Sequence, residues 1–105
     1  MFARSVTMRI RQSSVAEVNK IVEKEVVPLL QKQKGFRDEL VLVASNGSEV
    51  LGISLWDQKA DAEAYQRTTY AEVQKILSKV VEGTPQVQNY DVSHSTIHKV
   101  ATSHA

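Results

Sequence analysis

The chain has 105 residues, of which 42% are hydrophobic and 24% are charged, and 13 Lys and Arg against 12 Asp and Glu leave a net charge of +1. These values are typical of one globular domain with a single hydrophobic core, and they exclude an intrinsically disordered chain. The balanced charge gives no basic patch for nucleic acid or for an anionic membrane, so we expect neither partner.

The sequence contains no cysteine, which excludes disulfides, thiolate metal sites and cysteine nucleophiles. No apolar run approaches the ~18 residues that a membrane helix needs. The arginine-rich start lacks the apolar segment of a secretory signal, and its alternation favours a first strand over a cleaved leader. We therefore expect a cytoplasmic protein.

Apolar residues at even positions from 2 to 10 predict a first strand with one apolar face. Arg4 interrupts this pattern, and we expect its side chain to reach water at the free end of the strand. A helix is predicted over residues 14–34, because Ser14 and Glu17 match a capping box and apolar residues follow at spacings of three and four. Pro28 predicts a kink inside this helix, and Gly35 ends it.

The segments 36–44 and 49–56 are predicted strands that are apolar on both faces. Asn46 and Gly47 between them predict a hairpin with a type I′ turn. Within the second of these strands, Gly52 and Ser54 thin one face and leave room for another group to approach closely.

Asp57 is the expected N-cap of a second helix, with Ala60, Ala64 and Tyr65 facing inward. This helix is expected to break at residues 67–69 and to restart with a capping box of Thr69 and Glu72. Gly83 is expected to end it, and a last strand is predicted over residues 86–96.

The predicted order, β-α-β-β-α-β with a split second helix, is that of a ferredoxin-like α+β fold with a four-stranded antiparallel sheet. Its two helices cover one face of the sheet, whereas the two-sided strands present a second apolar face. We therefore expect a homodimer that packs through the open sheet face, because leaving that face in water is costly. A monomer with a solvated outer face is the alternative.

The Gly35-Phe36 strand start, the hairpin, the junction at residues 54–59 and the Ala64-Tyr65 pair resemble the antibiotic biosynthesis monooxygenase-like domain family of the dimeric α+β barrel superfamily. The resemblance covers about residues 4–95. It implies a single domain over residues 1–105, with a core at about 2–96 and a polar tail at 97–105. The family includes cofactor-free oxygenases, heme-degrading oxygenases, isomerases and members without an assigned activity.

Heme degradation is disfavoured by three differences from the family's heme-degrading members. The first strand has no asparagine, Tyr65 stands where those members have a tryptophan, and no histidine lies between Trp56 and Gly83.

A ligand pocket in this fold is expected between the sheet and the helices. The candidate lining residues are Met8, Phe36, Trp56, Tyr65 and Tyr70, with Arg9 or Arg11 as anion stabilisers if they point inward. The competing interpretation is that Trp56 and Tyr65 fill the core and the interface, and no catalytic residue is assigned.

All three histidines, His94, His98 and His104, fall in the last twelve residues. An extended segment places residues four apart ~13 Å from one another, so we expect no shared metal ion. No nucleotide-binding, hydrolase or zinc motif is present, and an RNA-recognition module is disfavoured because strand three, EVLGISLW, has aliphatic residues where stacking rings are needed.

Two functional hypotheses follow. The first is a cofactor-independent oxygenase of quinols or polycyclic phenols. The second is a non-enzymatic homodimer that binds a small apolar or aromatic ligand or serves as an accessory protein.

Overall fold

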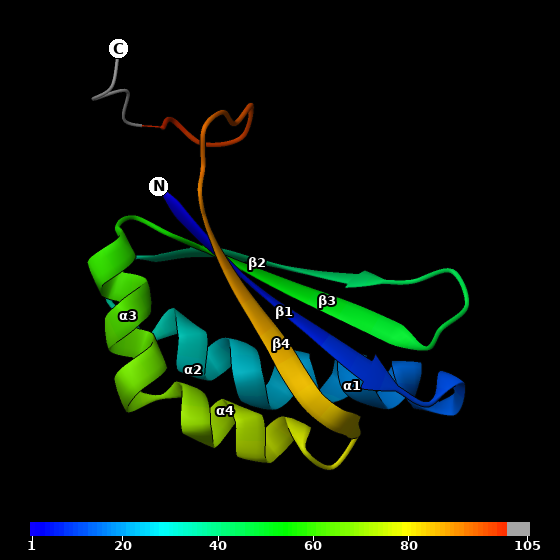
Figure 1. Ribbon diagram of the computed structural model, residues 1–105. Helices are drawn as coiled ribbons and strands as arrows, with labels where there is room; N and C mark the ends of the chain where they lie inside the picture. The colour runs from blue at the N-terminus through cyan, green and yellow to red at the C-terminus, as the bar shows by residue number, and fades with distance from the viewer. Residues whose placement is uncertain (101–105) are drawn as a thin grey trace.

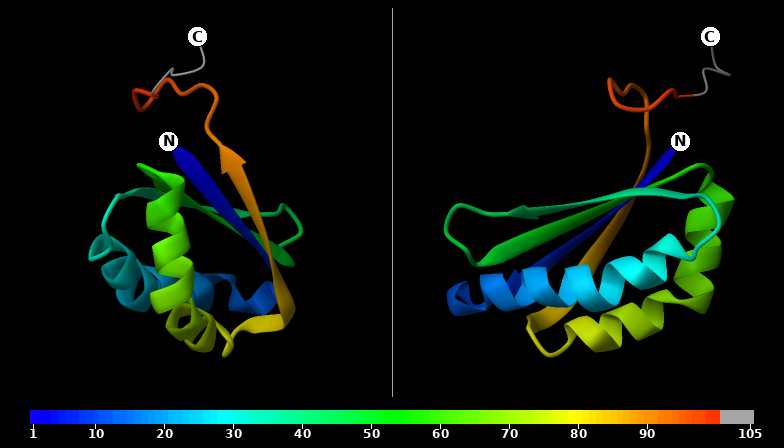
Figure 2. Two further views of the ribbon diagram at one scale, coloured as in Figure 1. Left: turned by 60° about the vertical axis from the view of Figure 1, so that its left-hand side comes forward. Right: turned by 180° about the vertical axis from the view of Figure 1, so that it is seen from behind.

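The computed structural model describes residues 1–100 as one antiparallel sheet with helices on one face (Figures 1 and 2). The strands lie in the order β2-β3-β1-β4, and their bounds are Phe2–Ile10 for β1, Phe36–Val43 for β2, Glu49–Trp56 for β3 and Val81–Asp91 for β4. The helical segments are η1 (Gln12–Ser14), α1 (Val15–Ile21), η2 (Val22–Val26), α2 (Val27–Gln31), α3 (Lys59–Thr68) and α4 (Tyr70–Leu77). The predicted ferredoxin-like α+β fold is confirmed.

The alternation of β1 places Phe2, Met8 and Ile10 in the core, as predicted. Arg4 does not reach water: it is only 3% exposed. The strand is paired on both sides at this position, with Ser54 of β3 and Asn89 of β4, and α3 and α4 lie over the inward face. An even-numbered side chain in β1 is therefore enclosed even near the end of the chain.

The first helix is one continuous run of 3₁₀, α, π and α turns from Gln12 to Gln31. A kink was predicted at Pro28. The structure has the π-helical segment η2 just before this residue, where the α-helical hydrogen-bond pattern changes and the missing backbone donor of proline is accommodated. The predicted capping box does not form, because Ser14 itself is helical and makes no side-chain cap. Gly35 has the positive φ of 79° that was expected after this helix.

The hairpin joins β2 and β3 where it was predicted, but its turn is of a different type. A type I′ turn needs positive φ at both central residues, and Asn46 is not among the residues with positive φ, whereas Gly47 has a φ of 72°. The Gly47 amide bonds the Ala44 carbonyl at 2.8 Å, and the Asn46 side chain accepts the Ser48 amide at 2.9 Å. This local bond stabilises a loop over residues 44–48, which is longer than the two-residue loop of a type I′ turn.

The second helix is split into α3 and α4 at Thr69, as predicted. Neither predicted side-chain cap forms, because both side chains have other partners, although Thr69 does occupy the N-cap position of α4. The Asp57 carboxylate accepts a hydrogen bond from Arg37 Nε, so Gln58 occupies the N-cap position without a side-chain cap. The Thr69 hydroxyl shares a 3.1 Å bond with the Thr68 hydroxyl.

Two further boundaries differ from the sequence prediction. The helix α4 ends at Leu77, and Gly83 lies inside β4, where the pairing with β1 shifts its register. The strand β4 consequently begins and ends about five residues earlier than expected. On α3, Ala62 is buried and Ala60 is exposed, so the inward face is rotated from the predicted one.

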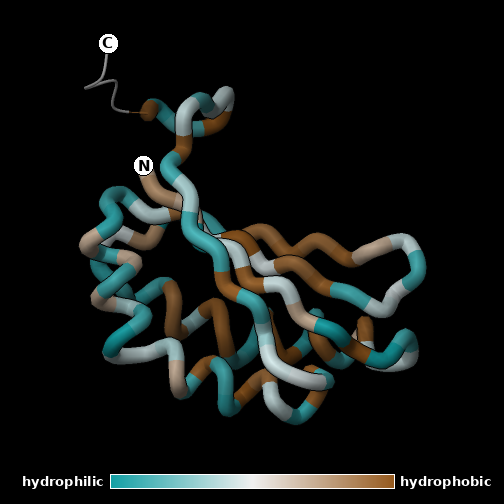
Figure 3. Tube along the Cα trace, viewed as in Figure 1, coloured by the Kyte–Doolittle hydropathy of each residue, from teal (hydrophilic) through white to brown (hydrophobic). Residues whose placement is uncertain are grey.

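The outer face of the sheet carries the second set of apolar side chains that the sequence predicted. Leu40 and Leu42 of β2 are each 48% exposed there, and they pair across the sheet with Ile53 and Leu51 of β3. Figure 3 shows the succession of hydrophobic residues along both strands. No helix among residues 1–100 is long and apolar enough to cross a membrane.

Candidate functional site

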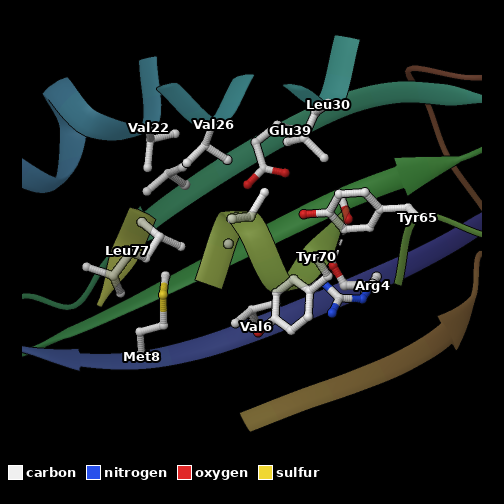
Figure 4. Close-up of a pocket in the computed structure, with 15 residues that line it drawn as sticks. Arg4, Val6, Met8, Val22, Val26, Leu30, Glu39, Tyr65, Tyr70 and Leu77 are labelled. Atoms are coloured by element: carbon white, nitrogen blue, oxygen red, sulfur yellow. Dashed lines mark hydrogen bonds between the residues drawn. The ribbon is translucent and has the colours of Figure 1, made fainter. Parts of the chain in front are cut away.

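A cavity lies between the inner face of the sheet and the helices (Figure 4). The empty space within it and its mouth totals about 500 Å³, of which about 40 Å³ is open to the centre of a water molecule. Most of its wall is aliphatic, and the lining residues are Arg4, Val6, Met8, Val22, Val26, Leu30, Glu39, Val41, Val50, Gly52, Ser54, Tyr65, Tyr70, Val73 and Leu77. An apolar cavity with a few polar groups is the usual form of a small-molecule site.

The polar groups come from four different elements: Arg4 from β1, Glu39 from β2, Tyr65 from α3 and Tyr70 from α4. Arg4 donates a hydrogen bond to the side-chain oxygen of Gln66. Its guanidinium carbon lies 4.1 Å from the centre of the Tyr70 ring and 5.4 Å from that of Tyr65. Cation–π contacts of this kind stabilise a guanidinium and fix its position.

Glu39 lies on the inward face of β2 and faces the same space as Arg4 (Figure 4). Its carboxyl lies over Gly52 of the neighbouring strand β3. A side chain at position 52 would place its Cβ 3.2 Å from Glu39 Oε1. Burial raises the pKa of Glu39 from 4.5 to about 8, against the opposing attraction of Arg4. Glu39 is therefore mostly protonated at pH 7. The close approach expected at Gly52 is that of this carboxyl.

Tyr65 presents its hydroxyl to the cavity and its ring to the core. Burial raises the pKa of Tyr65, with smaller opposing and reinforcing effects from Arg4 and Glu39, so its hydroxyl keeps its proton. The ring packs on Trp56 at a centroid distance of 5.1 Å. Trp56 is fully buried, and its Nε1 donates to Ser54 Oγ at 2.9 Å.

The pocket candidates from the sequence lie in several different environments. Met8, Tyr65 and Tyr70 line the cavity. Trp56 lies behind Tyr65, and Phe36 packs edge-on against Trp56 at 5.6 Å and lines a surface groove instead. Arg9 is exposed and lines no part of the cavity, and Arg11, which is also exposed, pairs with Glu82 at 3.7 Å.

Sequence reasoning missed Arg4 and Glu39, the two charged groups of the site. A partial signal was present for both, since each is a charged residue on an otherwise apolar part of its strand, but only in β1 does alternation assign the position to the interior. Glu39, Val22 and Val41 also line the groove between β2 and the first helix, so the cavity and this groove meet at Glu39.

The histidines lie away from the cavity. His98 bonds the Asp38 carboxylate on the opposite side of β2, His94 is exposed, and His104 lies outside the described residues. Within residues 1–100, no group of three His, Asp or Glu side chains is placed to hold a metal ion.

No protein-family model and no curated protein matches this sequence. Solved structures do match it. A monooxygenase from the gene ActVA-Orf6 of Streptomyces coelicolor, in complex with Nanaomycin D, superposes with a TM-score of 0.78 over 93% of this chain and 92% of its own, at 14% identity. The chain has the fold of the antibiotic biosynthesis monooxygenases.

Two more structures share this fold. SnoaB, a cofactor-independent oxygenase from Streptomyces nogalater solved as a mutant, matches with a TM-score of 0.74 over 92% of this chain and 97% of its own, at 10% identity. The NE2512 protein of unknown function from Nitrosomonas europaea matches with a TM-score of 0.74 over 93% and 94%, at 12% identity. The antibiotic biosynthesis monooxygenase fold thus occurs in oxygenases and in proteins without a known activity.

Proposed function

We propose that this protein is a cofactor-independent oxygenase that acts on a quinol or phenol bound in the cavity. The observation that carries the proposal is the polar end of the cavity, where a carboxyl with a raised pKa faces a buried guanidinium across an apolar space. The two oxygenases with the same fold support it.

Each polar group has a role in this proposal. The ionised form of Glu39, which is the minor form at pH 7 and predominates above about pH 8, accepts the hydroxyl proton of the substrate. Its pKa of about 8 lies close to that of a phenol at ~10, which suits a general base. Arg4 stabilises the resulting phenolate. The aliphatic wall keeps water from the electron-rich ring while oxygen reacts with it.

The reaction balances without an external reductant. A hydroquinone and O₂ give a hydroxyquinone and water, because the two electrons that reduce the second oxygen atom come from oxidation of the ring itself. A ring methylene, as in an anthrone, becomes a carbonyl, and its two hydrogens leave in the water formed from the other oxygen atom.

Oxygen uptake with a panel of hydroquinones, anthrones and single-ring phenols tests the proposal. We expect uptake above the buffer rate for at least one class, with a product that has gained one oxygen atom and lost two hydrogen atoms relative to the substrate. Glu39→Gln should slow the reaction by ~10²-fold or more, as removal of a general base does, whereas the exposed Glu72→Gln should not. Tyr65→Phe and Trp56→Phe separate a catalytic hydroxyl from ring packing. If the wild-type protein consumed no oxygen with any compound of the panel, the oxygenase proposal would be wrong.

The second candidate is a non-enzymatic, ligand-binding or accessory homodimer. The narrowness of the cavity favours it, since about 40 Å³ open to water centres leaves no room for a polycyclic substrate without movement of the walls. Ligand binding with a 1:1 stoichiometry and no oxygen consumption would establish this alternative.

We also propose that the protein is a homodimer whose outer sheet faces pack together. Leu40, Leu42 and Tyr90 are each about half exposed on that face, beside the partly exposed Leu51 and Ile53. A second copy of the same face is the partner that two-fold symmetry supplies most simply.

A further inference from the structure

The guanidinium of Arg4 is buried without a counter-ion. Its side chain bonds Gln66 and contacts the faces of two tyrosine rings, all of them neutral groups. Among residues 1–100, no carboxylate oxygen lies within 4.0 Å of its nitrogens. A buried charge is strongly destabilising unless an opposite charge or enough hydrogen bonds compensate it.

The groups around Arg4 do not supply that charge near neutral pH. The nearest acid across the cavity is Glu39, and burial holds its pKa at about 8 despite the attraction of Arg4, so it is mostly neutral at pH 7. The strand β3 contributes Ser54, α3 and α4 contribute tyrosine rings, and the first helix contributes only aliphatic side chains to the cavity. On its other side Arg4 borders a second hollow, whose lining includes Lys59 and Glu63, one residue of each charge.

The apolar part of the cavity limits the size of what can bind beside Arg4. Its free space of about 40 Å³ for water centres corresponds to about three water molecules, at ~10–15 Å³ each. Three waters occupy ~90 Å³ of liquid, which is the scale of one aromatic ring. The wall opposite Arg4 is formed by Met8, Val22 and Leu77, and a thioether side chain adapts easily to a flat ring (Figure 4).

We propose that the cavity binds an acidic single-ring aromatic compound, with its anionic oxygen at the Arg4 guanidinium and its ring against the aliphatic wall. The inference rests on the proposed function in placing the ligand in the same cavity, and it narrows the substrate class from polycyclic compounds to one ring. The anionic oxygen can belong to a carboxylate or to a phenolate, and both pair with a guanidinium.

Calorimetric titration at pH 6 to 7 with matched ligand pairs tests the proposal. Benzoate against benzamide probes the carboxylate, and 4-nitrophenol against 4-nitroanisole probes the phenolate, whose anion has its own absorbance band. We expect the anion of at least one pair to bind tenfold or more tighter than its neutral analogue, because a charge-assisted bond replaces a neutral one. Equal affinity within both pairs, or no binding of either anion, would overturn the proposal.

Two variants connect this preference to the residues. Arg4→Met should abolish the preference for the anion, whereas Arg9→Met, on the exposed face of the same strand, should leave it unchanged. In the wild type, benzoate affinity should fall by tenfold or more as pH rises above about 8, because ionised Glu39 then competes for Arg4. Glu39→Gln should remove that fall, since benzoate itself stays ionised throughout the range.

These outcomes keep the two proposals separate. Tight anion binding without oxygen uptake would remove the oxygenase and retain the anion site. Oxygen uptake with no preference for the anion would retain the oxygenase proposal and contradict the anion site. If Arg4→Met does not fold, the ligand pairs and the pH profile of Glu39→Gln still decide, and a benzoate affinity that is flat across pH 8 in the wild type would contradict the role of Arg4 and Glu39.

Discussion

Glu39 couples the stability of the protein to pH. Its pKa is raised from 4.5 to about 8 in the folded protein, so between these values the folded state holds a proton that the unfolded state has lost. The free energy of unfolding therefore falls as pH rises through this window, with a slope that approaches about 1.4 kcal/mol per pH unit from this group. Below pH 4.5 both states are protonated, and Glu39 adds no slope.

Urea denaturation of the wild type and of Glu39→Gln, at intervals from pH 4.5 to 8.5, isolates this effect. The amide keeps the size of the side chain but cannot ionise, so the variant should gain stability relative to the wild type as pH increases. Glu72→Gln, on the exposed surface of α4, is the control and should track the wild type. Parallel curves for Glu39→Gln and the wild type would show that the carboxyl is not buried in its neutral form.

Ser54 connects the buried tryptophan to the strand that carries Arg4. Its hydroxyl accepts the Trp56 Nε1 hydrogen at 2.9 Å and donates to the Arg4 carbonyl at 3.4 Å. Ser54→Ala leaves the indole donor buried without a partner, which should lower the free energy of unfolding by about 1–3 kcal/mol. In a Trp56→Phe background the same change should cost clearly less. Additive losses in the two backgrounds would contradict this pairing.

The charged residues of the site show what residue-level reasoning can recover. The alternation of β1 assigns Arg4 to the inward face, whereas β2 is apolar on both faces and its pattern does not assign a side to Glu39. The structure places both residues on the inward face. Their partners come from helices distant in sequence, so no local spacing could reveal that a guanidinium, a carboxyl and two tyrosines meet at one end of a cavity. The exposed position of Arg9, by contrast, follows from the same alternation that buried Arg4.

Among the helices and strands, order and number were predictable while the caps were not. Hydrophobic periodicity depends on the whole segment and survives local competition. A cap depends on one side chain, and Asp57 bonds Arg37 while Thr69 bonds Thr68. The early start of β4 also has a tertiary cause, since Val81 and Glu82 pair with the far end of β1 after a shift of register.

Gly35 and Gly83 have similar backbone angles but different surroundings. Substitutions at these two positions therefore distinguish the cost of backbone strain from the cost of a steric clash. Gly35 and Gly83 have φ values of 79° and 75°. A Cβ at Gly83 would meet nothing within 4 Å, whereas one at Gly35 would overlap the Asp61 carboxylate and lie 2.8 Å from the Asp61 Cβ. Gly83→Ala should therefore cost about 1–2 kcal/mol from the left-handed conformation alone.

Gly35→Ala should cost measurably more than Gly83→Ala, because the junction of α2 and β2 must also move away from α3. The Gly35 carbonyl accepts the Asp57 amide at 2.8 Å, so this movement disturbs the start of α3 as well. Thermal unfolding of both variants and of Gly35→Ala combined with Asp61→Ala provides the comparison. If both single variants lost the same stability, the Asp61 side chain would be able to move aside without cost.

At the scale of the whole molecule, the two faces of the sheet differ in how far they are covered. The inner face is covered by the helices and encloses the cavity, while the outer face leaves Leu40, Leu42 and Tyr90 about half exposed. At ~25 cal/mol per Å², burial of an apolar face of ~500 Å² would contribute more than ~10 kcal/mol of stabilising free energy. An exposed apolar patch of this size is typical of a protein interface.

The proposed dimer is tested by replacing two exposed leucines of the edge strand β2 on that face. Light scattering at micromolar concentration should give a mass near twice 11.7 kDa for the wild type. Leu40→Glu with Leu42→Glu places four carboxylates in the proposed interface of the dimer, so like-charge repulsion and lost burial should yield a monomer. Ile97→Glu is the matched control, because Ile97 is 78% exposed outside the sheet and its replacement should leave the dimer intact. A wild-type mass near 12 kDa would disprove the dimer, and the exposed leucines would then have to be explained by another partner.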